Sequence, residues 1–539
     1  MSLVAFIVLS FAFSGVALIV RGRAALSTAI GVVGLAVGVL AAIAITPGQV
    51  VIIGGGAIAT TAYMRLFLIL GAVVGLGLAV AGVAGGSRRD APAVTLCLLG
   101  TAGLTLGVSD VRAAVLAATA GGLFGILVTL VPSGGRAGAT VGIRETRAVV
   151  VAGALAVAAA AWIGRDLSQL SAQPVVFGLA YLAFALAVAL RFGAIPFHLW
   201  AARLADVVPE TALPMLTAFA PAALAVVAVA WTGASVAPLA VDLGPERAIV
   251  ITVAMASIVL AAVAAFVQDD IEHVLGYSIM GDAGVVVLAL AVLGPAAWAP
   301  ARMWIVAFVV ARSAFAAWAA GVRTGFWTGR VADLRGWARR SPILAVAFVL
   351  LVIASVGVPG LAAFDARRLL VNLALPEPLA TVASVAMLAP IAYYGRLLVI
   401  GLLRPDRVIE PGATWRPTIR ALDLTAIGPW LHATWAANRA FTTAVVAAAL
   451  GLLAVATSAG AFGGPSAAAE RPPAITVPGE RSSSAPSSAP SSAPSPIPSP
   501  TLASPEPTGA GPTTGPSGGS SSPSGPPGGS AAPSGPVAD

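Results

Sequence analysis

Lysine is absent from the 539-residue chain, so all 30 of its basic side chains are arginines. Charge of both signs is scarce, because charged residues make up 10% of the sequence and hydrophobic residues 58%, with a mean hydropathy of +0.95. Soluble domains carry about 25% charged residues. The composition therefore excludes a soluble globular protein and predicts a polytopic membrane protein. The formal net charge of +8 comes from arginines scattered between apolar runs, which argues against a nucleic-acid partner.

Cysteine is nearly absent as well, since Cys97 is the single one in the chain. One cysteine excludes both a disulfide framework within the chain and a cysteine-based metal cluster. Residues 2–20 are apolar, but no basic segment precedes them and the basic triplet RGR follows at 21–23. We therefore interpret this segment as a first membrane span and not as a cleaved signal peptide.

Apolar runs of the length needed to cross a bilayer, about 20 residues, recur along the chain. Fourteen spans are expected, at residues 3–20, 24–45, 64–86, 91–108, 112–132, 148–164, 173–195, 212–232, 248–267, 273–294, 303–321, 343–371, 378–403 and 441–463. Connections on one side contain most of the arginines, and those on the other keep only Arg112, Arg165, Arg247 and Arg302. The positive-inside rule makes the arginine-rich side cytoplasmic, so both termini of this multi-pass plasma-membrane protein are expected on the outer face.

Changes in composition suggest five segments. They are N-terminal transmembrane helices (1–90), a first helical half (91–232), a second helical half (233–403), a cytoplasmic connection with the last transmembrane helix (404–463), and a tail rich in Pro, Ser and Gly (464–539). The tail lacks the apolar residues needed to offset the entropy cost of ordering, so we expect it to be disordered. No chemistry is assigned to it.

Charged residues also occur inside the predicted spans. The bases are Arg65, Arg191, Arg312, Arg367, Arg368 and Arg396, and the acids are Asp282 and Asp365. Each costs at least about 2.5–3.5 kcal/mol at the centre of a membrane helix, so such groups should face the bundle interior, water or one another. Arg65 and Arg396 are also compatible with snorkelling to an interface.

Helix breakers interrupt three of these spans. The seventh contains Gly193 and Pro196 in FGAIPFH, the eighth contains Pro221, and the twelfth contains Gly357, Pro359 and Gly360 in SVGVPGLAAF. Broken helices are tolerated at membrane depth only where protein or a water-filled cavity satisfies the freed backbone groups. A single proline kink is compatible with ordinary packing. Two breaks that each accompany a cation, Arg191 and Arg367, indicate an ion path.

The segment QDDIEHVLGYSIMGDAG, residues 268–284, opens the tenth span. Glu272 and His273 fit either a solvated helix start or a station on a proton path. Asp282 lies nine residues after His273, about 13 Å along a helix axis, where a solvated position is hard to reach, so it is a candidate proton relay. His198, beside the seventh-span break, fits either a proton carrier or a structural hydrogen bond to a freed carbonyl.

Five stretches then resemble a known family. LRFGAIPFHLW, TALPMLTAFAPAALA, QDDIEHVLGYSIMGDAG, ADLRGWARRSPILAVAFVLLVIASVGVPGLAAFDARRLL and APIAYYGRLLVIGLL occur in the order seen in the N subunit of bacterial NADH-quinone oxidoreductase, respiratory complex I. This antiporter-like family also includes subunits of Na⁺/H⁺ antiporters and membrane-bound hydrogenases. The resemblance extends from about Ala91 to Leu403.

The resemblance implies an all-α polytopic bundle of about fourteen transmembrane helices in an antiporter-like inverted repeat. It further implies a membrane-arm subunit that takes part in proton translocation coupled to quinone reduction elsewhere in the complex. No cofactor is expected in this chain, because NADH, flavin, iron–sulfur clusters and quinone would bind elsewhere in the complex. The expected partners are other membrane subunits of a respiratory or antiporter complex, together with the lipid bilayer.

The chain departs from the family pattern at five positions. The family's lysines in the seventh span and after the twelfth-span break fall on Arg191 and Arg367, its eighth-span lysine falls near Ala222, and its tenth-span histidine falls on Asp282. Its fifth-span glutamate has no counterpart, since residues 111–143 contain no acid. Arginine keeps its proton where a buried lysine can release one. Two readings follow from the family, a divergent pump that uses Asp282 and Glu272 or a non-conducting structural paralogue. A self-contained transporter of a small solute is the third alternative.

Overall fold

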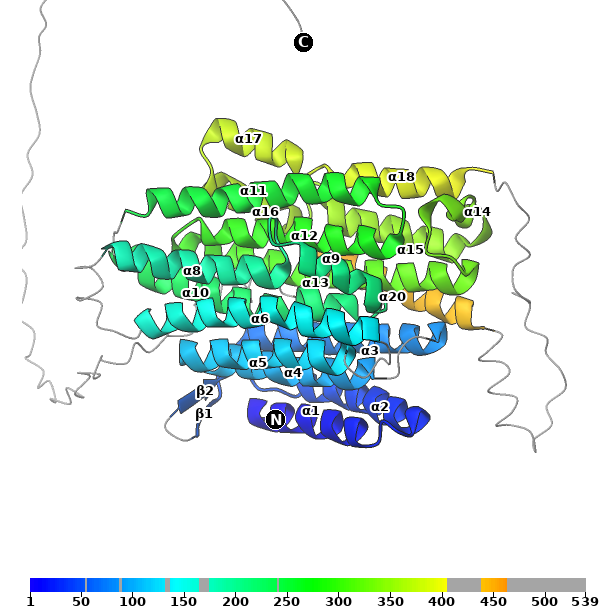
Figure 1. Ribbon diagram of the computed structural model, residues 1–539, viewed down its shortest axis with the longest axis horizontal. Coiled ribbons are helices and arrows are strands. Elements are labelled where there is room, and N and C mark those ends of the chain that lie inside the picture. The colour runs from blue at the N-terminus through cyan, green and yellow to red at the C-terminus, as the bar shows by residue number, and fades with distance from the viewer. Residues whose placement is uncertain are drawn as a thin grey trace, which may run out of the picture. The chain divides into compact units, whose positions relative to one another are not determined.

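The computed structural model describes residues 1–53, 56–86, 90–130, 136–163, 174–239, 242–404 and 438–462. The described residues form one compact helical unit (Figure 1). The predicted disordered tail and most of the predicted cytoplasmic connection lie outside the described residues.

All fourteen predicted spans have a helical counterpart. They are α1 (Leu3–Ile19), α2 (Ala24–Ile43), α3 (Ala62–Gly85), α4 (Ala91–Gly107), α5 (Val111–Leu130), α6 (Arg136–Ile163), α8 (Pro174–Phe192), α10 (Ala220–Leu239), α11 (Gly244–Val267), α12 (Ile271–Leu290), α13 (Trp298–Phe326), the pair α15 (Pro342–Val352) and α16 (Ala362–Ala374), the pair α17 (Glu377–Ala386) and α18 (Pro390–Leu402), and α20 (Arg439–Ser458). In the described chain, twelve helical segments are long and apolar enough to cross a membrane, and α1 and α4 are shorter apolar helices. The predicted class of an all-α polytopic bundle is confirmed.

Most of the long helices run side by side along one direction (Figure 1). Strands β1 (Val50–Ile53) and β2 (Gly56–Ala59) form an antiparallel hairpin at one end, which we call the hairpin end. The short helices α9 (Leu199–Val207) and α14 (Trp337–Arg340) lie toward the opposite end, which we call the α9 end. By the sequence-based topology, the hairpin end faces outward.

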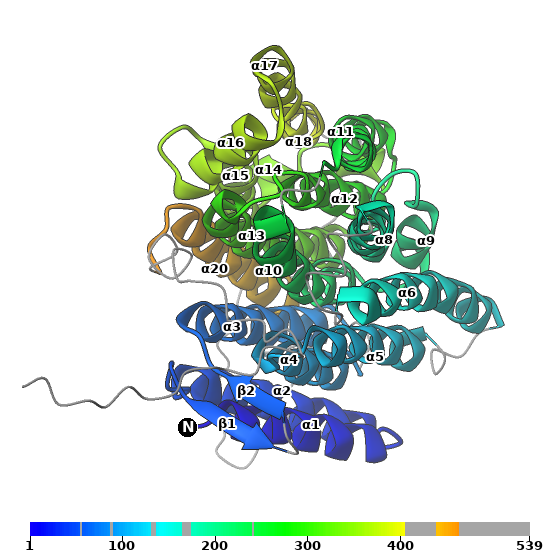
Figure 2. The same cartoon turned by 90° about the vertical axis from the view of Figure 1, so that its left-hand side faces the viewer.

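Helix α13 occupies the centre of the bundle (Figure 2). The most hydrophobic stretch of this helix is buried along its whole length. Arg302 and Arg312 on this helix are therefore enclosed by protein and not exposed to lipid. The sequence-based assignment of Arg302 to a connection is wrong, because α13 begins five residues earlier than expected and Arg302 is 1% exposed. The faces of Trp298 and Tyr63, at 4.1 and 4.8 Å from its guanidinium carbon, accommodate that charge.

The predicted break in the seventh span is present. Helix α8 ends at Phe192, and Gly193 follows with φ +65°, a left-handed conformation that glycine adopts without strain. The Leu190 carbonyl accepts hydrogen bonds from the Gly193 amide at 3.0 Å and from Trp200 Nε1 at 2.8 Å, and the Ile195 amide donates to Ser257 Oγ at 2.9 Å. Side chains of the protein thus pair with backbone groups at the break.

The predicted breaks in the eighth and twelfth spans are present as well. A π-helical turn, Met215–Phe219, precedes α10 and Pro221, and a second one, Ile353–Gly357, separates α15 from α16. Gly357 and Gly360 have φ values of +74° and +96°, which end the π turn and redirect the chain around Pro359. The thirteenth span is interrupted between α17 and α18, a break that the sequence reading missed.

Candidate functional site

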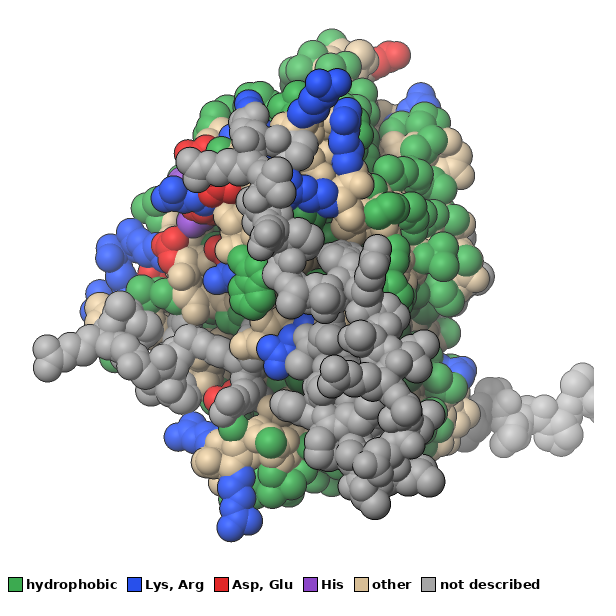
Figure 3. Space-filling model, turned by 90° about the vertical axis from the view of Figure 1, so that its right-hand side faces the viewer, with side chains coloured by type: hydrophobic (Ala, Val, Ile, Leu, Met, Phe, Trp, Pro, Cys, Tyr) green, Lys and Arg blue, Asp and Glu red, His purple; other side chains and the backbone are tan. Residues whose placement is uncertain are grey.

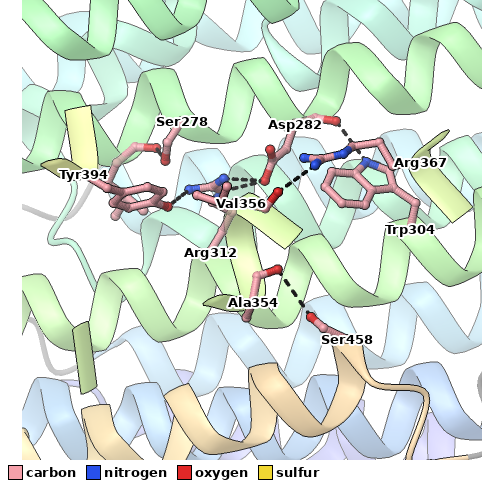
Figure 4. Close-up of polar contacts among 10 residues, drawn as sticks. Ser278, Asp282, Trp304, Arg312, Ala354, Val356, Arg367, Tyr394 and Ser458 are labelled. Carbon is pink, nitrogen blue, oxygen red and sulfur yellow. Dashed lines mark hydrogen bonds and ion pairs between the residues drawn. The ribbon is translucent and has the colours of Figure 1, made fainter. Parts of the chain in front are cut away.

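A buried ion pair joins the tenth and eleventh spans. Asp282 of α12 is 5% exposed and Arg312 of α13 is fully buried. The Nε and Nη2 atoms of Arg312 each lie 2.6 Å from Asp282 Oδ2, and Nη1 donates a hydrogen bond to the Tyr394 hydroxyl (Figure 4). Each charge compensates the desolvation of the other, so removal of one partner would leave an uncompensated buried charge.

Arg367 lies on the other side of Asp282 (Figure 4). Its Nη2 donates to the Val356 carbonyl at 2.6 Å, an oxygen freed by the π turn, and its guanidinium carbon lies 5.3 Å from the centre of the Trp304 ring. Trp304 Nε1 in turn donates to the Asp282 carbonyl at 3.2 Å. Two of the predicted site residues, Asp282 and Arg367, are therefore brought together through the tryptophan.

Two cavities meet at Arg367. An opening of about 640 Å³ lies between α16 and α17, and a small space of about 20 Å³ reaches Asp282 and Tyr393. Both are lined by Arg367 and Met387. The small space is of the size that holds a single water molecule. Arg367 thus separates a wide cavity from a water-sized space beside the buried carboxylate.

Arg191 forms a separate buried cation on α8. It is 2% exposed, and within the described chain its Nε and Nη2 atoms have no hydrogen-bond partner. Its guanidinium packs against Gly122 of α5, where a Cβ atom would lie 2.3 Å from Nη2. A glycine therefore stands in the fifth span beside the cation.

Charged side chains of both signs gather on part of the face at the α9 end of the bundle (Figure 3). Arg323 of α13 lies 2.9 Å from Glu210 and also pairs with Glu272, while His273 Nε2 lies 3.0 Å from Asp206 Oδ1. Glu272 and His273 are ten and nine residues from Asp282 on α12, which corresponds to about 15 and 13 Å along the helix. The structure places Glu272 and His273 in an ion-pair cluster at the α9 end, separate from the central Asp282–Arg312 pair.

His198 and Asp365 belong neither to the central site around Asp282 nor to the ion-pair cluster at the α9 end. The His198 ring lies 6.2 Å from the Tyr277 ring, and in the described chain its Nδ1 has no hydrogen-bond partner. Asp365 is exposed in the first turn of α16 and lines neither of the cavities at Arg367. The carbonyl hydrogen bond considered for His198 is not among its described contacts.

Several arginines of the predicted spans and connections have structural contacts. Arg65 Nη2 donates to the Ile43 carbonyl at 2.7 Å, and Arg396 Nη1 donates to the Gln268 carbonyl at 2.6 Å. These carbonyls lie at or just beyond the carboxyl ends of α2 and α11, where cations are favourable. Arg247 likewise caps two helices through the carbonyls of Ala291 and Ala374, at 2.8 and 2.7 Å.

Sequence reasoning missed the partners of the charges that it found. The residues missed are Arg312 as the partner of Asp282, Tyr394 as the partner of Arg312, Glu210, Ser257 and Gly122. Arg312 was recognisable, because a carboxylate buried in the membrane requires a cation and Arg312 lies in the next span. Within the described residues, no group of three or more His, Cys, Asp and Glu side chains is placed to hold a metal ion.

The broken spans and buried charges define a class, a polytopic helical bundle with discontinuous helices and charged residues in its interior. Residues 157–389, which contain Arg191, Asp282, Arg312 and Arg367, match the family model described as "NADH:quinone oxidoreductase/Mrp antiporter, TM". The chain is 31% identical over 255 residues to NADH-quinone oxidoreductase subunit N of Halorhodospira halophila, covering 44% of this chain and 51% of that relative. The sequence-based resemblance to this antiporter-like family is confirmed.

Solved structures share the fold. A chain in the Mrp complex of Dietzia sp. DQ12-45-1b has a TM-score of 0.70 at 18% identity, covering 88% of this chain and 98% of that one. A chain of respiratory complex I from Thermus thermophilus has a TM-score of 0.63 at 20% identity, covering 86% and 99%. At these identities the likeness shows the fold alone. The chain spans about half the length of the curated relatives it matches.

Proposed function

We propose that this chain is a membrane-arm subunit of a NADH-quinone oxidoreductase-like complex and takes part in proton translocation coupled to quinone reduction elsewhere in that complex. The observation that supports this most strongly is the buried Asp282–Arg312 pair beside Arg367, at a helix break that opens to a cavity. The family match includes all three residues. Relatives named subunit N support the assignment to a respiratory complex.

In this function, Asp282 is the group that exchanges a proton. Arg312 and Arg367 stay charged under practically all conditions, so they supply a fixed positive field on both sides of the carboxylate. The water-sized space beside Arg367 gives a proton a route between Asp282 and the wide cavity at the hairpin end. At the α9 end, Glu272 and His273 belong to the ion-pair cluster through which a proton would enter α12.

The proposal assigns no redox chemistry to this chain. NADH, flavin, iron–sulfur clusters and quinone would bind to other subunits of the complex, and the partners of this chain would be the neighbouring membrane subunits. Such a chain contributes a charged path and a rigid interface. The redox reaction would act on it through those neighbours.

A non-conducting structural paralogue is the second candidate. Gly122 beside Arg191 favours it, because no acid of the fifth span is present to pair with that cation and be separated from it. Ala222, which stands near the expected position of the eighth-span lysine, is fully buried. Membership in an Mrp-type antiporter or hydrogenase-like complex is a further alternative, since the Mrp chain has the same fold.

The Asp282→Asn variant distinguishes conduction from a structural role. It preserves the size of the side chain and removes its charge, so we expect coupled proton uptake into membrane vesicles to fall at least tenfold per assembled subunit. Asp242→Asn is the matched control, because Asp242 is exposed and caps the Gly244 amide, a contact that asparagine also makes. Its uptake should equal that of the wild type.

Assembly has to be measured in the same vesicles. Arg312 loses its partner in Asp282→Asn, and breaking a buried pair costs about 3–5 kcal/mol. Asp282→Glu retains the charge and serves as the second variant, with partial recovery of uptake expected. Wild-type uptake by assembled Asp282→Asn would reject the proton path and leave the structural paralogue.

A further inference from the structure

The wide cavity between α16 and α17 has the size of a ligand site. Its volume is about 640 Å³, within the range of about 300–1,000 Å³ typical of small-molecule sites and far above the share of about 30 Å³ that one water takes up. Both helices lie at the edge of the bundle when it is viewed from the hairpin end (Figure 2). The proposed proton route needs only a chain of single waters, so it does not account for this volume.

The wall of this cavity is cationic and rich in hydrogen-bond donors. Arg367 and Arg368 line it from α16, and Glu377 is the single acid among its described lining residues. Arg367 is 3% exposed and directs Nη2 to a backbone carbonyl, whereas Arg368 is exposed to the cavity. Asn372 and Ser384 line the same cavity and supply neutral donors, whereas the Thr381 hydroxyl donates to the Glu377 carbonyl at 3.2 Å. Adjacent arginines with hydroxyl and amide donors suit the oxygens of a phosphate group.

The position of the cavity relative to the membrane suits a headgroup. Arg368 lies six residues before the end of α16, about 9 Å along the axis, a depth from which an arginine side chain reaches the interface. Val385 and Leu388 line the cavity and are 65% and 41% exposed, and the neighbouring Leu379 is 55% exposed. The cavity therefore combines a cationic wall with an apolar surface that would face lipid chains.

We propose that this cavity binds an anionic phosphate group, with Arg368 as the main contact, Arg367 on the inner wall, and the donors of Asn372 and Ser384 around it. The phosphate is that of a phospholipid headgroup in the leaflet at the hairpin end, or a free phosphate ion. The bound anion holds α16 and α17 together across the cavity. The site shares Arg367 and this cavity with the proposed proton route, but binding of the anion does not require that the chain conducts protons.

The test titrates the purified full-length chain in non-ionic detergent with phosphatidylglycerol, phosphatidylcholine and inorganic phosphate, and measures bound ligand by native mass spectrometry. Arg368→Gln should weaken phosphatidylglycerol binding about 10- to 100-fold, the loss of one charged hydrogen-bonding contact. Ser384→Ala leaves every charge in place and should weaken it about threefold or more. Arg112→Gln is the matched control, because it removes an arginine at the start of α5, outside this cavity, and should change the Kd less than twofold.

The three ligands identify the source of the phosphate. Saturable phosphatidylglycerol binding that inorganic phosphate does not displace assigns a headgroup, and displacement at equal concentration assigns a free anion. Binding unchanged in both Arg368→Gln and Ser384→Ala would overturn the site. Equal weakening by Arg368→Gln and Arg112→Gln would also overturn it, since that indicates general charge attraction. If Arg368→Gln fails to fold, Ser384→Ala decides the outcome. Proton uptake is not part of the readout, so failure here leaves the proposed function unaffected.

Discussion

The contact between Arg191 and Gly122 predicts a strong coupling between two helices. A Cβ atom at position 122 would lie 2.3, 2.6 and 2.7 Å from Nη2, Cζ and Nη1 of Arg191, all well inside van der Waals contact. The variant Gly122→Ala should therefore push the guanidinium out of its packed position, at a cost of about 1–3 kcal/mol for overpacking a buried site. Alanine is the better helix former by about 0.5–1 kcal/mol, which offsets part of this cost.

Arg191→Met removes the cause of the clash. A methionine side chain ends at the position of the arginine Nε, so the three atoms that meet the new methyl group are gone. In this background Gly122→Ala should stabilise the protein by about 0.5–1 kcal/mol. The coupling energy of the double-mutant cycle should therefore be about 1–3 kcal/mol.

The assay is the free energy of unfolding of the four proteins in mild detergent, titrated with a denaturing detergent and followed by far-ultraviolet circular dichroism. A matched substitution is Gly395→Ala on α18, where a Cβ atom meets nothing within 4 Å. Gly395→Ala should change the free energy of unfolding equally whether residue 191 is arginine or methionine. If Gly122→Ala has the same effect with arginine as with methionine at 191, the packing of the guanidinium against α5 is wrong.

Three further outcomes are expected. If Arg191 is a station on the charged path, Arg191→Met abolishes coupled proton uptake while the protein stays inserted. Arg191→Lys retains uptake, because lysine can also release a proton. If Arg191→Lys restores neither uptake nor assembly, Arg191 is a structural clamp. Gly193→Leu should lower assembly or transport, because Gly193 has a φ of +65° and a Cβ atom there would lie 2.7 Å from Ala201 Cβ. Wild-type assembly and transport in this variant would contradict the broken-helix site. Ser484→Cys should react with an impermeant thiol reagent in intact cells. The parent protein is the control, because its single cysteine, Cys97, is buried and should stay unlabelled. Labelling only after lysis would contradict outward-facing termini.

Local properties of the chain predicted most of the fold. The length of an apolar run and the positions of Pro and Gly determine where a membrane helix lies and where it breaks, so the fourteen spans and three of the breaks were readable. The start of α13 could not be predicted in this way. An apolar run ends at Arg302, but in the structure the rings of Trp298 and Tyr63 pack against this arginine and the helix begins before it. The break between α17 and α18 was missed for a related reason, since the apolar run continues through Met387 and Leu388.

Contacts between distant helices were beyond the sequence reading. The pairing of Asp282 with Arg312 joins residues thirty positions apart on different helices, and which face of each helix meets the other is decided by packing. The contact of Arg191 with Gly122 is of the same kind. Sequence reasoning found both cations and the carboxylate, but it found neither the pairing nor the glycine.

At three buried positions the structure shows contacts that suit arginine better than lysine. Arg312 places two nitrogens on the Asp282 carboxylate, Arg367 lies near the Trp304 ring and binds a freed carbonyl, and Arg302 lies over two aromatic rings. Each contact uses the planar shape of the guanidinium, which an ammonium group lacks. In the proposed function, Asp282 is therefore the group whose charge changes, because these three arginines keep their protons. A conducting subunit and a structural paralogue with this fold therefore differ in what happens at that one carboxylate.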